Sequence, residues 1–219
     1  MIENRKFMDM QRLYRLFSRV PNGHSEMRNL ISKHMKSVGQ SINRAWLPSS
    51  TATSTTLKKS ASSLSSLDED ATATKSSLST TTNTAVVASP LKWVESMLEL
   101  KTTFDTVLCE SFFKDKRFET VMNDALESAV NENAKAPECV SLFLDENLRK
   151  GIKGKTEEEI EALLDNTITL FRFISEKDVF ERYYNMHLAK RLLNGKSTSE
   201  DMERSIISKL KVSDFFLGF

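Results

Sequence analysis

Apolar residues recur at steps of three and four along most of the chain, the spacing that places side chains on one face of an α-helix. One such stripe covers residues 7–20 and a second covers residues 27–42. The tripeptide Pro21-Asn22-Gly23 separates them, and proline beside turn-forming residues ends a helix. The two stripes consist of Phe7, Met10, Leu13, Phe17 and Val20, and of Met27, Leu30, Ile31, Met35, Val38 and Ile42.

Three more stripes follow between residues 90 and 150. Pro90 suits the first turn of a helix, where its missing N–H costs nothing, and Pro137 opens a short helix in the same way. After residue 150 the pattern loosens into Lys-Gly-Ile-Lys-Gly-Lys. The stripes consist of Trp93, Met97, Leu100, Phe104, Val107, Leu108 and Phe112; of Phe118, Val121, Met122, Ala125, Leu126, Ala129 and Val130; and of Val140, Phe143, Leu144 and Leu148.

The last third carries clear helix start and stop signals. Thr156 and Glu159 form a capping box, and Ser175 with Asp178 predicts a second helix start of the same kind. Asn194-Gly195 is typical of a helix C-terminus. Ser199 is the expected N-cap of a final helix. The apolar positions are Ile160, Leu163, Leu164, Ile168 and Phe171; Val179, Phe180, Tyr183, Tyr184, Leu188 and Leu192; and Met202, Ile206, Ile207 and Leu210.

These patterns predict an all-α fold. No stretch alternates with period two for more than a few residues, and four prolines and six glycines are too few for a turn-rich β fold. Consecutive helices with short connections form either a bundle or a helical solenoid of antiparallel helices. No internal repeat is evident, so periodicity leaves both architectures open.

Residues 49–89 interrupt the helical pattern. About half of them are Ser or Thr, and the segment has no aromatic residue and no glycine. Ordering a chain costs roughly 1–2 kcal/mol per residue, and the few leucines here follow no sustained period that could offset this cost. We therefore expect a disordered Ser/Thr-rich insert. Its composition also suits phosphorylation, although a low-complexity spacer is the simpler interpretation.

Composition excludes several classes of protein. The formal net charge of +1 gives no overall attraction to nucleic acid or to an anionic membrane. No apolar run reaches the roughly 18 residues of a membrane span, and residues 1–5 do not resemble a secretory signal. Cys109 and Cys139 lack the spacing of a disulfide framework or a zinc site. We expect no metal, no cofactor and a reducing location, the cytoplasm or the nucleus.

The last third also resembles a known family. Residues 173–184 (Phe-Ile-Ser-Glu-Lys-Asp-Val-Phe-Glu-Arg-Tyr-Tyr) and 187–193 (His-Leu-Ala-Lys-Arg-Leu-Leu) look like the opening of the cullin homology region. Residues 205–211 resemble the next helix of that region. Upstream, residues 1–4, 16–23, 141–145 and 150–154 look most like the cullin-3 branch. The matches flank the insert on both sides, so the chain is identified as a cullin fragment.

The resemblance implies a division of the chain. Residues 1–48 would be the first two helices of a cullin repeat, a helical unit of a solenoid, and residues 90–150 its remaining helices. Residues 156–211 would begin the cullin homology region as part of a helical bundle. Residues 212–219 do not look like the family's continuation, and the insert at 49–89 is longer than the connection usual there.

The resemblance also implies a function. Cullins are scaffolds of RING ubiquitin ligases that hold a substrate adaptor and a RING protein apart, for ubiquitin-dependent protein degradation. In the cullin-3 branch the adaptors are BTB-domain proteins, and the C-terminal partner is a RING-box protein. The main docking regions for both partners would lie outside these residues. We therefore expect protein partners only, no catalytic residue, and no ubiquitin transfer by the fragment itself.

Family-signature residues are the candidate site. Their polar members would brace the junction between the solenoid and the bundle, unless they form an ordinary amphipathic helix with solvated charges. For any single residue we favour the second interpretation. The signature consists of Lys177, Asp178, Val179, Phe180, Tyr183, Tyr184, His187, Leu188, Ala189, Arg191, Leu192, Ser208, Lys209 and Leu210.

Three alternatives compete with a ligase scaffold. A thiol hydrolase could use Cys139, because a helix N-terminus lowers the pKa of a thiol, although no motif links a histidine to it. Cys109 lies near an apolar stripe, and we expect it to be a small buried apolar residue. Basic residues are frequent in 5–44, but this segment lacks the exposed aromatic residues of a nucleic-acid reader. The third alternative is a helical interaction scaffold outside ubiquitin ligases.

Overall fold

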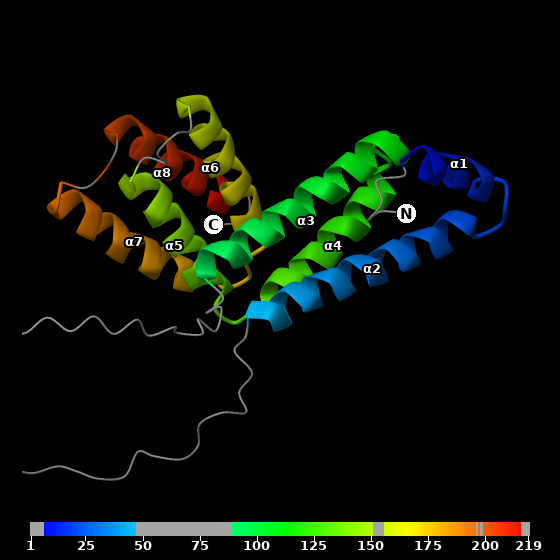
Figure 1. Ribbon diagram of the computed structural model, residues 1–219, viewed down its shortest axis with the longest axis horizontal. Helices are drawn as coiled ribbons and strands as arrows, with labels where there is room; N and C mark the ends of the chain where they lie inside the picture. The colour runs from blue at the N-terminus through cyan, green and yellow to red at the C-terminus, as the bar shows by residue number, and fades with distance from the viewer. Residues whose placement is uncertain (1–6, 47–88, 151–155, 196, 198, 216–219) are drawn as a thin grey trace, which may run out of the picture.

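The computed structural model describes residues 7–46, 89–150, 156–195, 197 and 199–215. Across these residues the chain forms eight α-helices and no β-strand, so the prediction of an all-α fold is confirmed (Figure 1). The expected disordered insert lies outside the described residues, except for Ser89. The loosened stretch after residue 150 and the end of the chain from residue 216 lie outside them as well.

Helix boundaries agree closely with the apolar stripes. The helices are α1 (Phe7–Phe17), α2 (Gly23–Trp46), α3 (Pro90–Ser111), α4 (Lys116–Asn131), α5 (Ala136–Lys150), α6 (Glu157–Phe171), α7 (Lys177–Leu193) and α8 (Glu200–Phe215).

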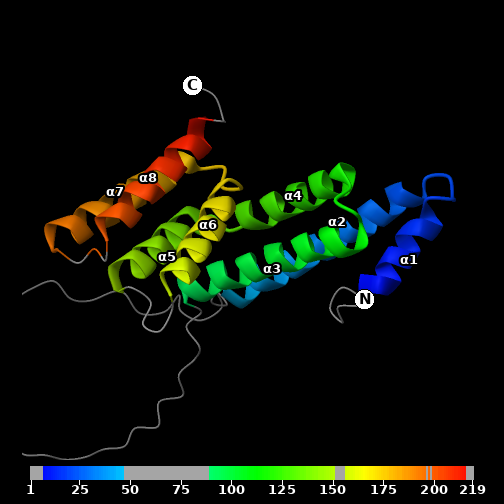
Figure 2. The same cartoon turned by 90° about the horizontal axis from the view of Figure 1, so that it is seen from above.

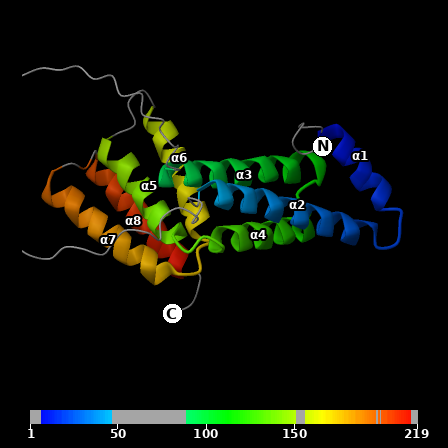
Figure 3. The ribbon, with the colours of Figure 1, turned by 60° about the horizontal axis from the view of Figure 1, so that its bottom comes forward.

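Two groups of helices make an elongated molecule. Helices α2, α3 and α4 lie side by side along the long axis, and α1 packs at the end farthest from α7 (Figures 2 and 3). We call α1–α4 the rod. Helices α5–α8 form the second group, in which α5 packs against both α6 and α7, and α6 against α8. Helix α3 contacts α5 and α6, so it extends from one group into the other.

A single apolar core runs through both groups, from Met10 in α1 to Leu210 in α8. Large side chains such as Trp93, Phe104 and Phe118 are almost fully buried in it. Burial stabilises the fold by about 25 cal/mol per Å² of apolar surface removed from water. Because the core is continuous, the two groups are packed together and are not joined only by a connecting loop.

Close packing of α2 on α4 depends on one glycine. A methyl group at Gly39 would lie 2.4 Å from the Cβ atom of Ala129, which is far inside van der Waals contact. The two helices therefore approach each other more closely than any larger residue at position 39 would permit.

Local signals explain several helix ends. The Thr156 side chain accepts a hydrogen bond from the Glu159 N–H, and Glu159 accepts one from the Thr156 N–H, so the expected capping box is present. Gly195 has φ of 59° after the last turn of α7, as the Asn-Gly stop signal predicts. Ser175 does not cap α7, because the helix begins at Lys177 and Glu176 occupies the N-cap position without a side-chain bond.

Some residues expected in or near apolar stripes, Leu192 among them, lie at the surface. Leu30 is 64% exposed because the buried face of α2 passes through Met27, Ile31 and Met35, one position away. Val20 is 55% exposed because α1 ends at Phe17, before the stripe would have reached it. Cys109 is also exposed, since the neighbouring Leu108 occupies the buried position in that turn of α3.

Candidate functional site at the helical junction

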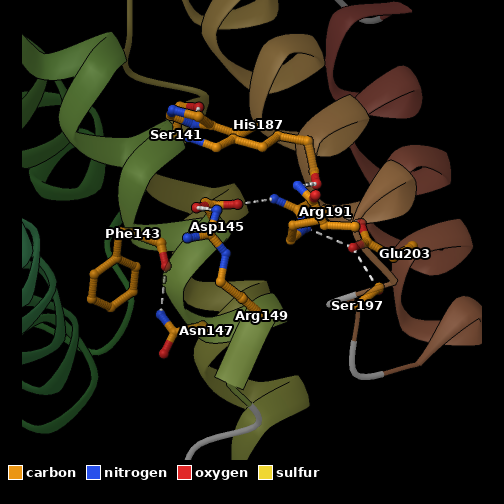
Figure 4. A network of polar contacts seen from close by, with 11 residues as sticks. Ser141, Phe143, Asp145, Asn147, Arg149, His187, Arg191, Ser197 and Glu203 are labelled. Atoms are coloured by element: carbon orange, nitrogen blue, oxygen red, sulfur yellow. Dashed lines mark hydrogen bonds and ion pairs between the residues drawn. The ribbon is translucent and has the colours of Figure 1, made fainter.

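A buried arginine joins three helices of the second group. Arg191 lies near the end of α7, and its side chain has no exposed surface. Its guanidinium donates to both carboxylate oxygens of Glu203 in α8, from Nε over 2.8 Å and from Nη2 over 2.9 Å. Its Nη1 donates to Asp145 in α5 over 2.7 Å (Figure 4). Bidentate pairing of this kind fixes the relative orientation of the two partners.

Further groups complete this cluster. Arg149 contacts the second oxygen of Asp145 over 2.8 Å, and the Ser197 hydroxyl donates to Glu203 over 2.9 Å (Figure 4). Asp145 and Glu203 are only 7% and 5% exposed at their side chains. Two arginines therefore balance two carboxylates, and of the four side chains only that of Arg149 is partly exposed. We call Asp145, Arg149, Arg191 and Glu203 the junction cluster.

The cluster keeps Arg191 charged. Burial on its own lowers the pKa of this guanidinium, but the hydrogen bonds that it donates to Glu203 and Asp145 outweigh burial and raise the pKa above the ordinary value. Removing one member of such a cluster is costly, because the remaining charges stay buried without compensation. The junction cluster thus resists any movement that would separate α5, α7 and α8.

His187 makes a second contact between α7 and α5. Its Nδ1 atom lies 3.0 Å from the Ser141 hydroxyl, and both residues are buried (Figure 4). Burial lowers the pKa of His187 below its usual 6.5; Asp145 acts in the opposite direction, whereas Arg191 lowers the pKa further. The imidazole is therefore neutral at pH 7 and contributes a hydrogen bond to the junction, but no charge.

Aromatic packing holds the first half of α7. The rings of Phe180 and Phe171 lie 4.5 Å apart between centroids, and Phe180 stacks on Tyr184 at 5.8 Å. The Lys177 ammonium lies 5.2 Å from the centroid of the Phe171 ring, a cation–π arrangement. Burial, with a smaller effect of Glu203, raises the pKa of the Tyr184 hydroxyl to about 12, so it stays protonated.

The structure divides the predicted signature residues into three groups. Phe180, Tyr184, His187 and Arg191 follow one face of α7 into the core, and Leu210 is buried in α8. The half-buried ones are Lys177, Val179, Tyr183, Leu188 and Lys209, and the exposed ones are Asp178, Ala189, Leu192 and Ser208. The bracing interpretation therefore fits the buried face, whereas the exposed residues match an ordinary amphipathic helix.

Lys209 joins the last helix to α6. Its ammonium donates to Asp165 and lies 3.4 Å from Glu161, and the bond to Asp165 is the main cause of its raised pKa. These carboxylates are about half exposed or more. Water screens such pairs, so we expect this contact to contribute little beside the buried cluster.

Sequence reasoning missed the acidic half of the junction. Glu203 is 3% exposed and lies on the buried face of α8 with Ile206 and Leu210, at steps of three and four. Asp145 similarly follows the buried Leu144 in α5. The signal was an ionisable residue at a core position, which requires a buried partner of opposite charge. The sequence alone does not pair either carboxylate with Arg191.

Cys139 does not have the properties of a hydrolase nucleophile. Cys139 lies in the first turn of α5, as expected, but it is only 1% exposed. Burial raises the pKa of its thiol to about 12, which is opposite to the activation that the thiol-hydrolase alternative requires. Within the described ranges no group of His, Cys, Asp or Glu is arranged to hold a metal ion.

Basic residues near the N-terminus take part in intramolecular contacts. The Arg28 guanidinium lies 5.7 Å from the centre of the Phe118 ring, and that of Arg15 lies 5.5 Å from the centre of the Phe113 ring. Arg12 pairs with Asp9 over 3.4 Å. Two members of the predicted basic patch, Arg15 and Arg28, thus lie against aromatic rings, whereas Arg12, Arg19, Lys33, Lys36 and Arg44 are exposed. In the part of the chain that the structure describes, no helix has the length and apolarity to cross a membrane.

Comparison with known proteins agrees with this architecture. Residues 1–215 match the family model described as the cullin alpha solenoid domain. The chain is 38% identical to Cullin-3 of Dictyostelium discoideum and 35% identical to Cullin-3A of Arabidopsis thaliana. It is 37% identical to Cullin-3 of Schizosaccharomyces pombe. Each alignment covers 96% of this chain.

These relatives are much longer than the chain. The aligned residues amount to 22% of the Dictyostelium protein and to 24% of the other two. The chain therefore spans about a quarter of the length of these relatives. Where the boundary between the cullin repeat and the cullin homology region lies, at residues 150–156 or elsewhere, stays a prediction.

Proposed function

Because the chain belongs to the cullin family, we propose that it is a rigid scaffold segment of a cullin-3-like RING ubiquitin ligase. In this role it holds the adaptor-binding and RING-binding ends of the ligase at a fixed separation. The observation that carries the proposal is the buried junction cluster, in which Arg191 of α7 ties α5 to α8. A cluster of this kind maintains a geometry, which is the property that a spacer requires.

Geometry alone can accelerate a reaction between two bound partners. Holding reactants in one assembly raises their effective concentration, and a stiff spacer keeps that concentration constant by preventing the partners from drifting apart. The elongated core from Met10 to Leu210 supplies stiffness along the rod and through the second group. The scaffold therefore contributes position, and the chemistry belongs to the enzymes that it brings together.

The partners follow from the family. We expect the complete scaffold to bind BTB-domain adaptors at one end and a RING-box protein at the other, through regions outside residues 1–219. These residues alone would then support no ubiquitin transfer, and the process that they serve would be ubiquitin-dependent protein degradation. The expected location is the cytoplasm or the nucleus.

A segment exchange tests the proposal. Residues 1–215 would replace the aligned segment of Dictyostelium Cullin-3, and ubiquitin transfer would be measured with its RING-box protein, a BTB adaptor and a charged E2. We expect transfer well above that of a scaffold lacking the segment. Normal partner binding without transfer would contradict the proposal and favour a helical scaffold outside ubiquitin ligases. The 219-residue chain alone, with E1 and E2, is expected to form no ubiquitin chains.

A further inference from the structure

The last residue of α4 makes direct hydrogen bonds to the turn between α6 and α7. The Asn131 side-chain amide donates to the Phe173 carbonyl oxygen over 2.8 Å. Its carbonyl oxygen accepts the Ser175 N–H over 2.9 Å. The same amide nitrogen also donates to the Glu127 carbonyl oxygen in the preceding turn of α4, over 2.9 Å. One side chain thus forms hydrogen bonds with its own helix and with a carbonyl group and an N–H group of a distant turn.

This arrangement is specific to an amide side chain. Both a donor and an acceptor are needed, because the two backbone groups of the turn have opposite polarity. A carboxylate could still accept from Ser175, but it would repel the carbonyl oxygen of Phe173. The turn itself is well anchored, since Ile174 between these two residues is 2% exposed. Asn131 therefore contacts a fixed point of the second group.

Helix α7 is consequently held near both of its ends. It begins at Lys177, two residues after Ser175, and Arg191 lies fourteen residues after Lys177. At 1.5 Å per residue these two attachments are about 20 Å apart along the helix axis. One attachment leads to the rod through Asn131, and the other leads to α5 and α8 through the junction cluster. A helix fixed at two separated points cannot pivot about either of them.

We propose that Asn131 is a positioning residue that fixes the N-terminal end of α7, and so the direction of this helix, relative to the rod. This inference rests on the proposed function, in which that direction determines where the bound partners lie. Without Asn131, the N-terminal end of α7 is held only by its packing against Phe171 and α5, so we expect that end to move more than the end at Arg191. Asn131 is exposed, so water replaces the lost hydrogen bonds and overall stability changes little.

Distance measurements between two nitroxide labels test this assignment. The labels would be placed on Ser37→Cys in α2 and Glu181→Cys in the first half of α7, both exposed positions. Cys109→Ser removes the exposed native thiol, and Cys139 is too buried to be labelled. Pulsed dipolar spectroscopy of the 219-residue chain then gives the distribution of the distance between the rod and α7.

Asn131→Ala is expected to broaden and shift this distribution while the thermal midpoint stays close to that of the parent. Asn131→Asp keeps one of the two contacts with the turn and should fall in between. It also serves as the test if the alanine variant does not fold. The matched control is Asn185→Ala at an exposed position on α7, which should leave the distribution unchanged.

The outcomes separate the two proposals. A narrow parent distribution that stays narrow in both Asn131 variants would overturn the role of Asn131 and leave the rigid-spacer proposal intact. A parent distribution that is already broad would contradict the proposal of a rigid spacer. It would also contradict the role of Asn131, which rests on that proposal. Narrowness in the parent and the control, with broadening in the variants, supports both proposals.

Discussion

At the scale of single residues, ionisable groups in the core carry the structural specificity of this chain. Arg191, Asp145 and Glu203 are buried together, and Arg191 is the counter-charge that the two carboxylates share. A buried ion cluster is a weak source of net stability, because desolvation of the charges opposes their attraction. Its stronger effect is to disfavour every arrangement in which the three helices are displaced.

Replacing Arg191 should therefore be severe. Arg191→Met leaves the carboxylates of Asp145 and Glu203 buried without their main counter-charge, and we expect a loss of about 3–5 kcal/mol in the free energy of unfolding. Urea denaturation followed by circular dichroism measures this loss. The matched control is Arg182→Ala on the exposed face of α7, which should cost about 0–1 kcal/mol. Equal costs for the two variants would show that the cluster does not hold the junction.

His187 predicts an acid-sensitive junction. Its folded-state pKa lies below the usual 6.5, in surroundings that contain Ser141, Asp145, Arg149 and Arg191. Below pH 6.5 the imidazole of the unfolded chain is protonated, whereas that of the folded chain still stays neutral. Protonation therefore favours the unfolded state, and the free energy of unfolding that depends on His187 is intact above this pH and falls as the pH decreases. His187→Gln should lose less stability between pH 7 and pH 5.5 than the parent. A larger loss in the variant would contradict this assignment.

The two cysteines should differ sharply in reactivity. Cys109 is exposed, whereas burial raises the pKa of the Cys139 thiol to about 12. A thiol-specific reagent at pH 8 should therefore modify one thiol quickly in the folded chain and the second only after denaturant is added. Rapid modification of both thiols without denaturant would contradict the burial of Cys139. Cys139 would then again be a candidate nucleophile.

At the scale of helices, apolar stripes and end signals were sufficient for most of the fold. The stripe of α3, from Trp93 to Phe112, is buried throughout, and the Thr156 capping box is formed as expected.

The positions that the apolar pattern predicted wrongly have physical causes. Leu30 lies one position off the buried face of α2, where the small Gly39 and the polar Asn43 occupy core positions that a search for apolar residues overlooks. Asn43 is satisfied there, because it donates to the Ala129 carbonyl oxygen over 2.9 Å.

The contact of α2 with α4 supplies a prediction at this scale. Gly39→Ala would place a methyl group against Ala129, and we expect the overpacked interface to lose about 1–3 kcal/mol of stability. This loss should outweigh the roughly 1 kcal/mol by which alanine favours a helix over glycine. Thermal denaturation measures the difference. The double variant Gly39→Ala with Ala129→Gly should recover stability, whereas a single variant more stable than the parent would contradict the close approach.

At the scale of the whole molecule, the family resemblance added what periodicity could not supply. Helical stripes alone left a bundle and a solenoid equally open, and the residues around Phe180 and His187 pointed to the cullin family, which the comparisons confirm. The pairing of Arg191 with Asp145 and Glu203, and of Asn131 with the turn at Ser175, depends on tertiary contacts across 12 to 46 residues. No local pattern encodes such contacts, so these parts of the junction required the structure.

We propose that this segment contributes a stiff junction to a ligase scaffold. The most direct test introduces Arg191→Met into the exchanged Dictyostelium scaffold and measures transfer and partner binding in the same sample, with Arg182→Ala as the control. We predict reduced transfer for Arg191→Met while the adaptor and the RING-box protein still bind as in the parent. Full transfer by a scaffold whose junction has been loosened in this way would contradict the account.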